Sequence, residues 1–143
     1  ADPRRALLLG MLHSTAKPAP IAGSDDNHEK VLQSRSKMRL YLNDDTKVML
    51  LETPAGNKIT LSEEDKTIKI EDQNGNAIKL DKDGIRIESS KALTLKAGTE
   101  LKLEAGSSLT VKGGSDLKLQ GTSGAELTST GTTTVKGSFV KLN

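Results

Sequence analysis

Apolar and polar residues alternate along the C-terminal part of the chain, and the alternation returns every eight residues. From Lys91 the blocks read KALTLKAG, TELKLEAG, SSLTVKGG and SDLKLQGT, and the pattern then weakens through SGAELTST to GTTTVKGS. In each of the first four blocks, two apolar residues stand two positions apart with a polar residue between them. A period of two predicts a β-strand with one buried and one solvated face.

We predict that the apolar positions of this array face inward and form the core of the assembled protein. With two isoleucines that precede the array, they are Ile85, Ile87, Leu93, Leu95, Leu101, Leu103, Leu109, Val111, Leu117, Leu119, Leu127 and Val135. The array ends in a different pattern, because the expected apolar positions hold Lys141 and Asn143. The apolar residues there are Phe139, Val140 and Leu142, which we interpret either as a docking platform for a tip protein or as a plug for the end of the core.

Each block closes on small residues, which predicts a corner in the backbone. The closing residues are Ala97, Ala105, Gly113, Gly121, Ser129 and Gly137. Glycines follow at positions 98, 106 and 114. Because glycine reaches positive φ without steric cost, we expect the chain to turn there. Self-similarity at a fixed period is typical of a solenoid or array.

Eight residues are too few for one chain to enclose a core, since a three-sided coil of hexapeptides takes about 18. Either one chain folds into a two-sided roll, or three chains each supply one side of a triangular prism. One Leu-x-Leu pair per strand is a thin core, and the chain has no cysteine for a disulfide, so we favour three chains. A meander of hairpins is less favoured, because the corners lack Asn-Gly and Asp-Gly turns.

The middle of the chain carries the same strand unit with irregular spacing. Short apolar pairs stand at Val48/Leu50, Ile59/Leu61, Ile68/Ile70, Ile78/Leu80 and Ile85/Ile87. Segments rich in Pro, Gly, Asn and Asp separate them, and two of these segments contain Asn-Gly or Asp-Gly, which favour hairpins. This section is therefore either antiparallel or loosely wound. Residues 30–42 form a further predicted strand region, and no helix longer than one turn is expected.

Composition agrees with an elongated shape and a narrow core. The 143 residues include one Phe, one Tyr and no Trp, too few aromatics for an ordinary globular core. The net charge of +2 does not suggest nucleic-acid binding, and we read the mild basic excess after residue 88 as a solvated strand face. No apolar run approaches the ~20 residues of a membrane span. Arg4-Arg5 and the apolar run that follows superficially resemble a signal peptide, but we interpret this segment as a strand of an upstream domain.

Candidate catalytic and metal-binding residues are few. The acidic segment 63–65 (EED) and the segments 72–76 (DQNGN) and 81–84 (DKDG) are interpreted as turns rather than as paired catalytic carboxylates or calcium loops. His13 and His28 have no partner at ligand spacing, and no Gly-x-Ser-x-Gly segment or phosphate-binding loop occurs. We read Thr99, Ser115 and Ser123 as corner or inward small residues. The sequence therefore predicts neither enzymatic activity nor a metal or other cofactor.

Several segments, in order, resemble the spike proteins of contractile injection systems. Residues 2–14 (DPRRALLLGMLHS) are similar to the closing strand of the oligonucleotide-binding-fold domain of these spikes. Segments 33–36 (QSRS) and 42–46 (LNDDT) resemble the start of the needle, and segments 53–61 (TPAGNKITL), 68–72 (IKIED), 75–76 (GN) and 84–89 (GIRIES) continue it. The chain thus resembles the C-terminal part of VgrG-like and phage baseplate spike proteins over nearly all its length.

This resemblance implies a domain order and a fold. Residues 1–13 would be the last strand of an oligonucleotide-binding-like domain, 14–29 a linker, 30–88 an irregular base of the needle, and 89–143 a regular needle. The fold implied is all-β, an intertwined triple-stranded β-helix built by a homotrimer.

The resemblance also implies a function and partners. We expect a needle that pierces the target envelope at the tip of a contractile tail of a phage or type VI secretion-like system, where it delivers effectors or payload. Expected partners are a proline-alanine-alanine-arginine (PAAR)-type tip protein at the C-terminal end, tail tube or baseplate hub proteins at the N-terminal end, and transiently the target membrane. The particle would assemble in the cytoplasm before secretion or delivery. The alternative is a trimeric fibre or adhesin stalk that binds a surface receptor or glycan.

Overall fold

The computed structural model describes residues 13–142, which form β-strands, turns and extended segments without a helix. The predicted upstream strand falls almost entirely on residues 1–12, outside the described part. Seven strands of five residues follow one another along the chain. They are β1 (Glu29–Gln33), β2 (Arg39–Asn43), β3 (Val48–Glu52), β4 (Lys58–Ser62), β5 (Thr67–Glu71), β6 (Ala77–Asp81) and β7 (Gly84–Glu88).

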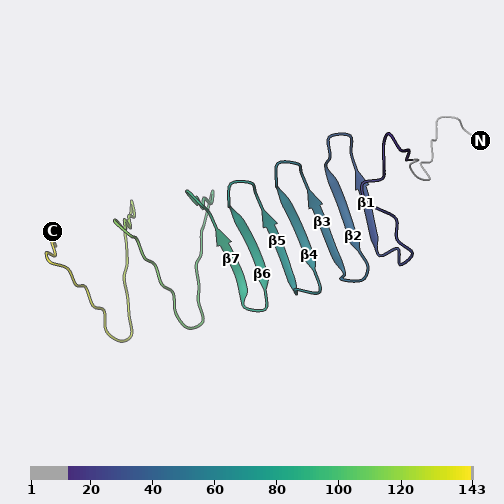
Figure 1. Cartoon of the computed structure of the whole chain (residues 1–143). Coiled ribbons are helices and arrows are strands. Elements are labelled where there is room, and N and C mark those ends of the chain that lie inside the picture. Colours follow the sequence, from purple (N-terminus) through teal and green to yellow (C-terminus); the bar gives the residue numbers. More distant parts are fainter. Residues whose placement is uncertain (1–12, 143) are drawn as a thin grey trace, which may run out of the picture. The chain divides into compact units, whose positions relative to one another are not determined.

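The seven strands form one antiparallel sheet in which each strand pairs with its neighbour in sequence (Figure 1). We refer to this sheet, residues 29–88, as the meander. Of the two arrangements left open for the middle of the chain, the antiparallel one is therefore correct. The predicted strand region 30–42 is wrong as a single element, because a turn at residues 34–38 divides it into β1 and β2. Ser34 Oγ accepts a hydrogen bond from the N–H of Met38, and Lys37 adopts a positive φ of 65°.

The turns of the meander follow a 19-residue period that the irregular spacing of apolar pairs conceals. Turns of five residues begin at positions 34, 53 and 72, and the intervening turns begin at positions 44, 63 and 82. The first two intervening turns have four residues, whereas the last has two. Each repeating unit is thus a pair of strands with one five-residue and one shorter turn.

Turn chemistry explains why the chain reverses at these places. Gly56 and Gly75 hold the left-handed conformation in two five-residue turns, at φ values of 99° and 83°. Lys47 and Lys66 hold it in the four-residue turns, where Asn43 Oδ1 and Ser62 Oγ accept hydrogen bonds from turn N–H groups. Local side-chain acceptors of this kind favour turns over a continuing strand.

The register of the sheet brings most of the apolar side chains onto one face, in two rows that cross the strands. The first row is Leu32, Leu40, Leu51, Ile59, Ile70, Ile78 and Ile87, in which each residue is paired with the next across the sheet. The second row is Leu42, Met49, Leu61, Ile68, Leu80 and Ile85. In β3 the residues on this face are Met49 and Leu51, so the predicted pair Val48/Leu50 is wrong by one residue.

The opposite face of the sheet is mainly polar, although it also holds Val31, Tyr41, Val48 and Leu50, and it carries ion pairs. Arg39 and Glu52 pair across β2 and β3 with 2.9 Å between Nη1 and Oε1. Lys69 pairs with Glu71 at 2.8 Å and Lys79 with Asp81 at 2.9 Å, each two residues apart and therefore on the same face. The hydrogen bond from Lys79, followed by that from the N–H of Asp83, lowers the pKa of Asp81. Such exposed pairs keep the face solvated and add little to stability.

The chain divides into two units, Ala1–Lys96 and Ala97–Asn143. The second unit contains the eight-residue array apart from residues 91–96, and its backbone bends at residues 98–99, 106–107, 114–115, 122–123 and 130–131, with extended segments between them. These bends confirm the predicted period of eight. The predicted positive φ is wrong, however, because glycines 98, 106 and 114 lie outside the left-handed region. Glycine is instead required at positions 113 and 121, where a Cβ would collide with the backbone carbonyl of Asp116 or of Gly124.

Candidate assembly surface

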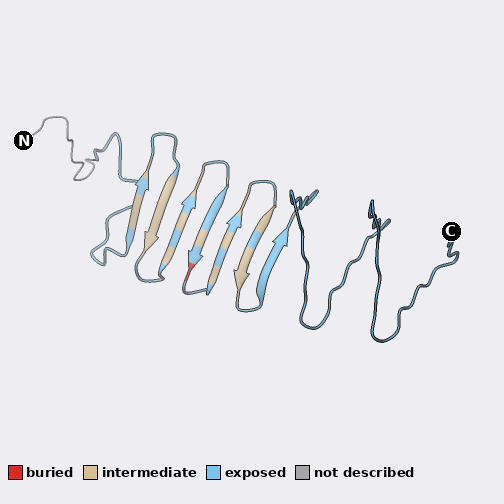
Figure 2. Ribbon diagram, turned by 180° about the vertical axis from the view of Figure 1, so that it is seen from behind, coloured by how far each residue is buried: buried red, intermediate tan, exposed pale blue. Residues whose placement is uncertain are grey.

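The chain by itself has no hydrophobic core within its described residues. Ser62 is the one residue there that is buried, at 6% exposure, and Figure 2 shows every other strand residue as exposed or intermediate. The accessible surface of the chain is 13753 Å². A compact monomer of 15.2 kDa would expose about 7000 Å². The chain therefore exposes about twice the surface of a compact monomer of the same mass.

The exposed apolar surface of the meander is continuous rather than scattered. The first row lines a trough of about 980 Å³, and Leu93 joins it beyond β7. The second row, apart from Ile85, lines another trough of about 880 Å³. Exposure in the rows rises to 60% at Leu32 and 72% at Ile85. Monomeric proteins rarely expose apolar patches larger than a few hundred Å², so the apolar face of the meander has the properties of an interface.

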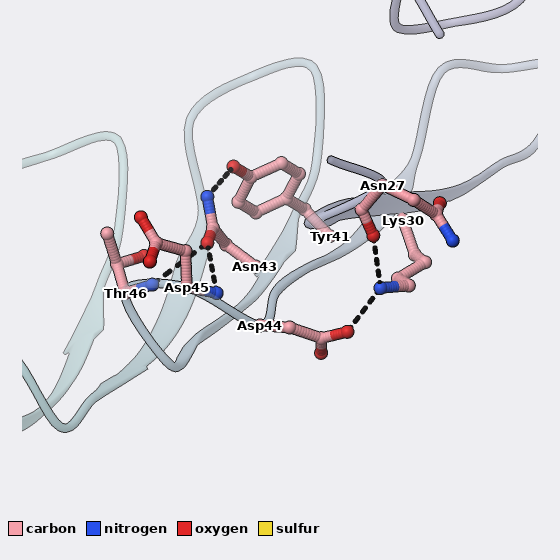
Figure 3. A network of polar contacts seen from close by, with 7 residues as sticks. All are labelled: Asn27, Lys30, Tyr41, Asn43, Asp44, Asp45 and Thr46. Carbon is pink, nitrogen blue, oxygen red and sulfur yellow. Dashed lines mark hydrogen bonds and ion pairs between the residues drawn. The ribbon is translucent and has the colours of Figure 1, made fainter. Parts of the chain in front are cut away.

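One end of the second row is closed by charge. Lys30 stands in the row position next to Leu42, where the other strands carry an apolar residue. Its Nζ donates a hydrogen bond of 2.6 Å to the carbonyl of Asn27 and pairs with the carboxylate of Asp44, as Figure 3 shows. Figure 3 also shows Asn43, which donates to the hydroxyl of Tyr41 and accepts from the N–H groups of Asp45 and Thr46. The β2–β3 turn is therefore tied at several points at this end of the sheet.

The structure brings part of the predicted inward set together. Ile85 and Ile87 occupy the last positions of the two rows, and Leu93 lines the first trough with Ile87. The remaining members lie in extended segments of the eight-residue array and are more than half exposed. They are Leu95, Leu101, Leu103, Leu109, Val111, Leu117, Leu119, Leu127 and Val135. Their burial between chains stays a prediction, as does a docking role for Phe139, Val140 and Leu142, which are 81%, 47% and 90% exposed.

The backbone of the array differs sharply from that of the meander. Within residues 92–142 no backbone N–H donates to a backbone carbonyl. A strand pattern whose backbone groups have no partner in their own chain exposes a template for pairing with another chain. The array is therefore the second component of the candidate assembly surface.

Sequence reasoning did not assign the apolar residues of β1–β6 to the inward set. These are Leu32, Leu40, Leu42, Met49, Leu51, Ile59, Leu61, Ile68, Ile70, Ile78 and Leu80. The 19-residue period of the turns would have found them, because it aligns these positions on one face. The spacing of the apolar residues does not reveal this 19-residue period, whereas the positions at which the turns begin do.

The segments considered for chemistry form exposed turns in the structure. Asp72 accepts hydrogen bonds from the N–H groups of Asn74 and Asn76 and from both of their side-chain amides, at 2.8–3.0 Å. The bond from the Asn74 side chain contributes most to lowering the pKa of Asp72 to about 2. In the EED turn, Asp65 accepts from Ser62 Oγ and Glu63 pairs with Lys47. Both segments thus act as turns, as interpreted.

Two further observations concern the part of the chain that the structure describes. No group of three or more His, Cys, Asp or Glu side chains within it is arranged to hold a metal ion. No helix within it is long and apolar enough to cross a membrane.

Comparison with known protein families shows to which family the chain belongs. A model of the phage baseplate V C-terminal trimerisation domain matches residues 47–143, which include β3–β7 and the whole array. The match covers more than half of the chain, so the protein belongs to this family. Membership supports a homotrimer and a structural role in a phage baseplate spike. It agrees with the resemblance seen in the sequence. The chain has no match among curated proteins.

Proposed function

We propose that the chain is the needle of a membrane-piercing spike, in which three copies wind into a triangular β-helical prism. The observation that carries the proposal is the uncovered apolar surface, which extends from two rows on the meander into an array whose backbone has no partner in its own chain. Three chains around one axis would cover the rows, and pairing between the chains would satisfy the strand backbones of the array.

A prism of this kind suits a puncturing element. Its narrow core and closed strand pairing leave no free edges along the shaft. Entangled chains separate slowly, because unfolding requires all three to unwind. In this proposal, contraction of a tail drives the needle through the target envelope for delivery of effectors or payload. The needle assembles in the cytoplasm within a phage or type VI secretion-like particle, with a PAAR-type protein at its tip and tube or hub proteins at its base.

Shortening the shaft without changing its phase tests this function. Deletion of residues 99–114 removes two complete blocks, and the remaining blocks keep their order. In particles whose spike carries this deletion, we expect adsorption to target cells to be unchanged and potassium leakage from those cells to fall several-fold. A control of unchanged length replaces block 99–106 with a copy of block 107–114 and should retain leakage.

The same experiment distinguishes the alternative function. An adhesin or fibre stalk acts by binding, so shortening it would reduce adsorption before any effect on the membrane. Loss of adsorption with normal leakage per adsorbed particle would therefore contradict the needle and favour the stalk. We favour the needle, because an adhesin would need exposed aromatic residues on which a glycan can stack. The array has none before Phe139.

A further inference from the structure

The first four blocks of the eight-residue array do not specify their own register between copies. Leucine recurs at positions 93, 101, 109 and 117, and small residues recur at the corners. A shift of one chain by eight residues would therefore place leucine beside leucine and corner beside corner. Register is weakly specified where a shift leaves the buried pattern unchanged. An element outside these four blocks must align the three chains.

The meander also repeats, with its period of 19 residues, but its two ends differ from the repeating unit. Its last turn, at residues 82–83, has two residues where the equivalent turns have four. Its second row begins at a charged residue, Lys30, which is held by Asn27 and Asp44 (Figure 3). A shift by one pair of strands would place the Lys30 ammonium group against the apolar row of another copy. Burial of an unpaired charge is strongly unfavourable, so the meander has one preferred alignment.

A cluster of hydrogen bonds joins the meander to the first corner of the array. We call it the Asn76 clasp, and it consists of Asn76, Ser89 and Ser90. Asn76 Oδ1 accepts hydrogen bonds from Ser89 Oγ at 3.0 Å and from the N–H of Ser90 at 3.1 Å. Ser90 Oγ donates to the carbonyl of Asn74 at 2.8 Å. The amide nitrogen of Asn76 is in turn held by Asp72 Oδ2 at 2.8 Å.

The clasp lies where backbone pairing changes. Before it, β7 is paired with β6 in the same chain. After it, residues 92–142 have no backbone partner in that chain. Ser89 and Ser90 form the whole connection between β7 and the first block, and the clasp holds both of them. If the conformation of this connection were not fixed, the array of one chain could shift by one block relative to the arrays of the other two chains.

We propose that the meander sets the register of the three chains and that the Asn76 clasp transmits this register to the array. The partner is a second and a third copy of this chain, so the inference rests on the proposed trimer. Asn76 acts as a positioning residue, because it fixes where the first block of the array begins without contacting the blocks that pair between chains.

The chain offers a matched control one 19-residue unit earlier. Asn57 stands at the position equivalent to Asn76, and its Oδ1 accepts a hydrogen bond of 3.4 Å from the N–H of Gln73. This bond joins two turns within the meander and does not touch the junction with the array. Asn57→Ala therefore removes a similar contact without affecting the clasp.

Disulfide trapping tests the proposal in the whole 143-residue chain, which contains no cysteine of its own. Leu119→Cys places one thiol on each chain, far along the array. In a trimer with cyclic symmetry the same residue of each copy lies at the same level, so mild oxidation should link two chains when they are in register. Native mass spectrometry of each variant gives the oligomeric state separately from the yield of the link.

We expect the parent Leu119→Cys protein and its Asn57→Ala variant to be trimers with high yields of the linked dimer. In Asn76→Ala the yield should fall at least three-fold while the trimer mass is kept, and Ser89→Ala combined with Ser90→Ala should change it in the same direction. Loss of the trimer in Asn76→Ala but not in Asn57→Ala would also support the proposal, because it places the defect at the junction.

Three results would overturn the register proposal. They are equal yields in Asn76→Ala and Asn57→Ala, equal loss of the trimer in both, and a parent trimer that does not link at position 119. A parent protein that is a monomer would instead contradict the proposed needle itself. The two failures are therefore distinguishable from the mass and the linking yield of the parent.

Discussion

The meander and the eight-residue array have the same side-chain pattern but differ in the hydrogen bonding of their backbones. Both place apolar residues two apart, as in Ile68-Lys69-Ile70 and Leu101-Lys102-Leu103. In the meander every strand pairs with a neighbour from the same chain. In the array no backbone pairing occurs within the chain. A Leu-x-Leu pattern therefore indicates a strand with one apolar face, but it does not indicate which chain supplies the neighbouring strand.

The difference between the two regions originates in their corners. The turns of the meander have acceptor side chains and residues at positive φ, such as Gly56 and Lys66, and these reverse the chain. The corners of the array have small residues outside the left-handed region, and they bend the chain instead. A reversed strand lies beside its predecessor, whereas a chain that only bends carries its next strand away. Corner chemistry thus separates pairing within a chain from pairing between chains.

The largest effect is expected where charge enters the interface of the array. Leu103→Asp combined with Leu119→Asp would bring six carboxylates into the core of the trimer without partners, so we expect assembly to stop. Size-exclusion chromatography with light scattering measures the outcome. Thr110→Asp combined with Gln120→Asp adds the same charge at polar positions and should leave the trimer intact. Soluble trimers of the leucine variant would contradict the inward assignment.

A cavity in the meander should have a smaller effect. Ile70→Ala removes a side chain from the first row, and if that row is buried between chains the loss should be about 2–5 kcal/mol per chain. The denaturant midpoint of the purified trimer reports it. Lys69→Ala, next to it on the polar face, removes one exposed ion pair and should cost less than about 1 kcal/mol. Equal effects of the two variants would show that the rows are not covered.

Substitutions of glycine sharpen the distinction between turns and corners. Gly75→Ala forces a residue with a Cβ into the left-handed region, at a φ of 83°, and should destabilise the protein by roughly 1–2 kcal/mol. At Gly98 a Cβ meets nothing within 4 Å of its own chain, so Gly98→Ala should change stability by less than about 0.5 kcal/mol. Thermal unfolding measures both variants. A large loss at position 98 would mean that another chain packs against that corner.

The smallest effect is expected on the dependence of unfolding on pH. The pKa of Asp72 is lowered in the folded protein from 3.8 to about 2 by its hydrogen bonds, chiefly that from Asn74. A lowered pKa means that the ionised carboxylate stabilises the fold above pH 3.8, and that this contribution is lost as the pH falls towards 2. Asp72→Asn should therefore show a weaker dependence of unfolding on pH over this interval. An identical dependence in both proteins would contradict the role of Asp72 in its turn.

Much of the fold was predictable, and the errors have local causes. The pattern gave the all-β class and the period of eight, and it placed Ile85 and Ile87 in one set, which the structure confirms by their shared position on the apolar face. In β3, which reads VMLLE, Val48/Leu50 and Met49/Leu51 are both apolar pairs two residues apart. The pattern alone therefore does not show which pair lies on the apolar face. Only pairing of Leu51 with Ile59 and of Met49 with Leu61 decides which set shares a face with the other rows. The turn at residues 34–38 was missed because its Ser34 acts through a hydrogen bond that composition does not reveal.

By itself the sequence determined that the chain forms strands with one apolar face, where the array bends, and that its apolar content is too thin for a monomer. These properties follow from periodicity and composition, which are local. The tertiary structure decided which strands are neighbours, which side chains share a face, and that backbone pairing within the chain ends at Glu88, just before the clasp. Such properties depend on hydrogen bonds between residues far apart in sequence. A pattern that repeats along one chain does not indicate which residues form them.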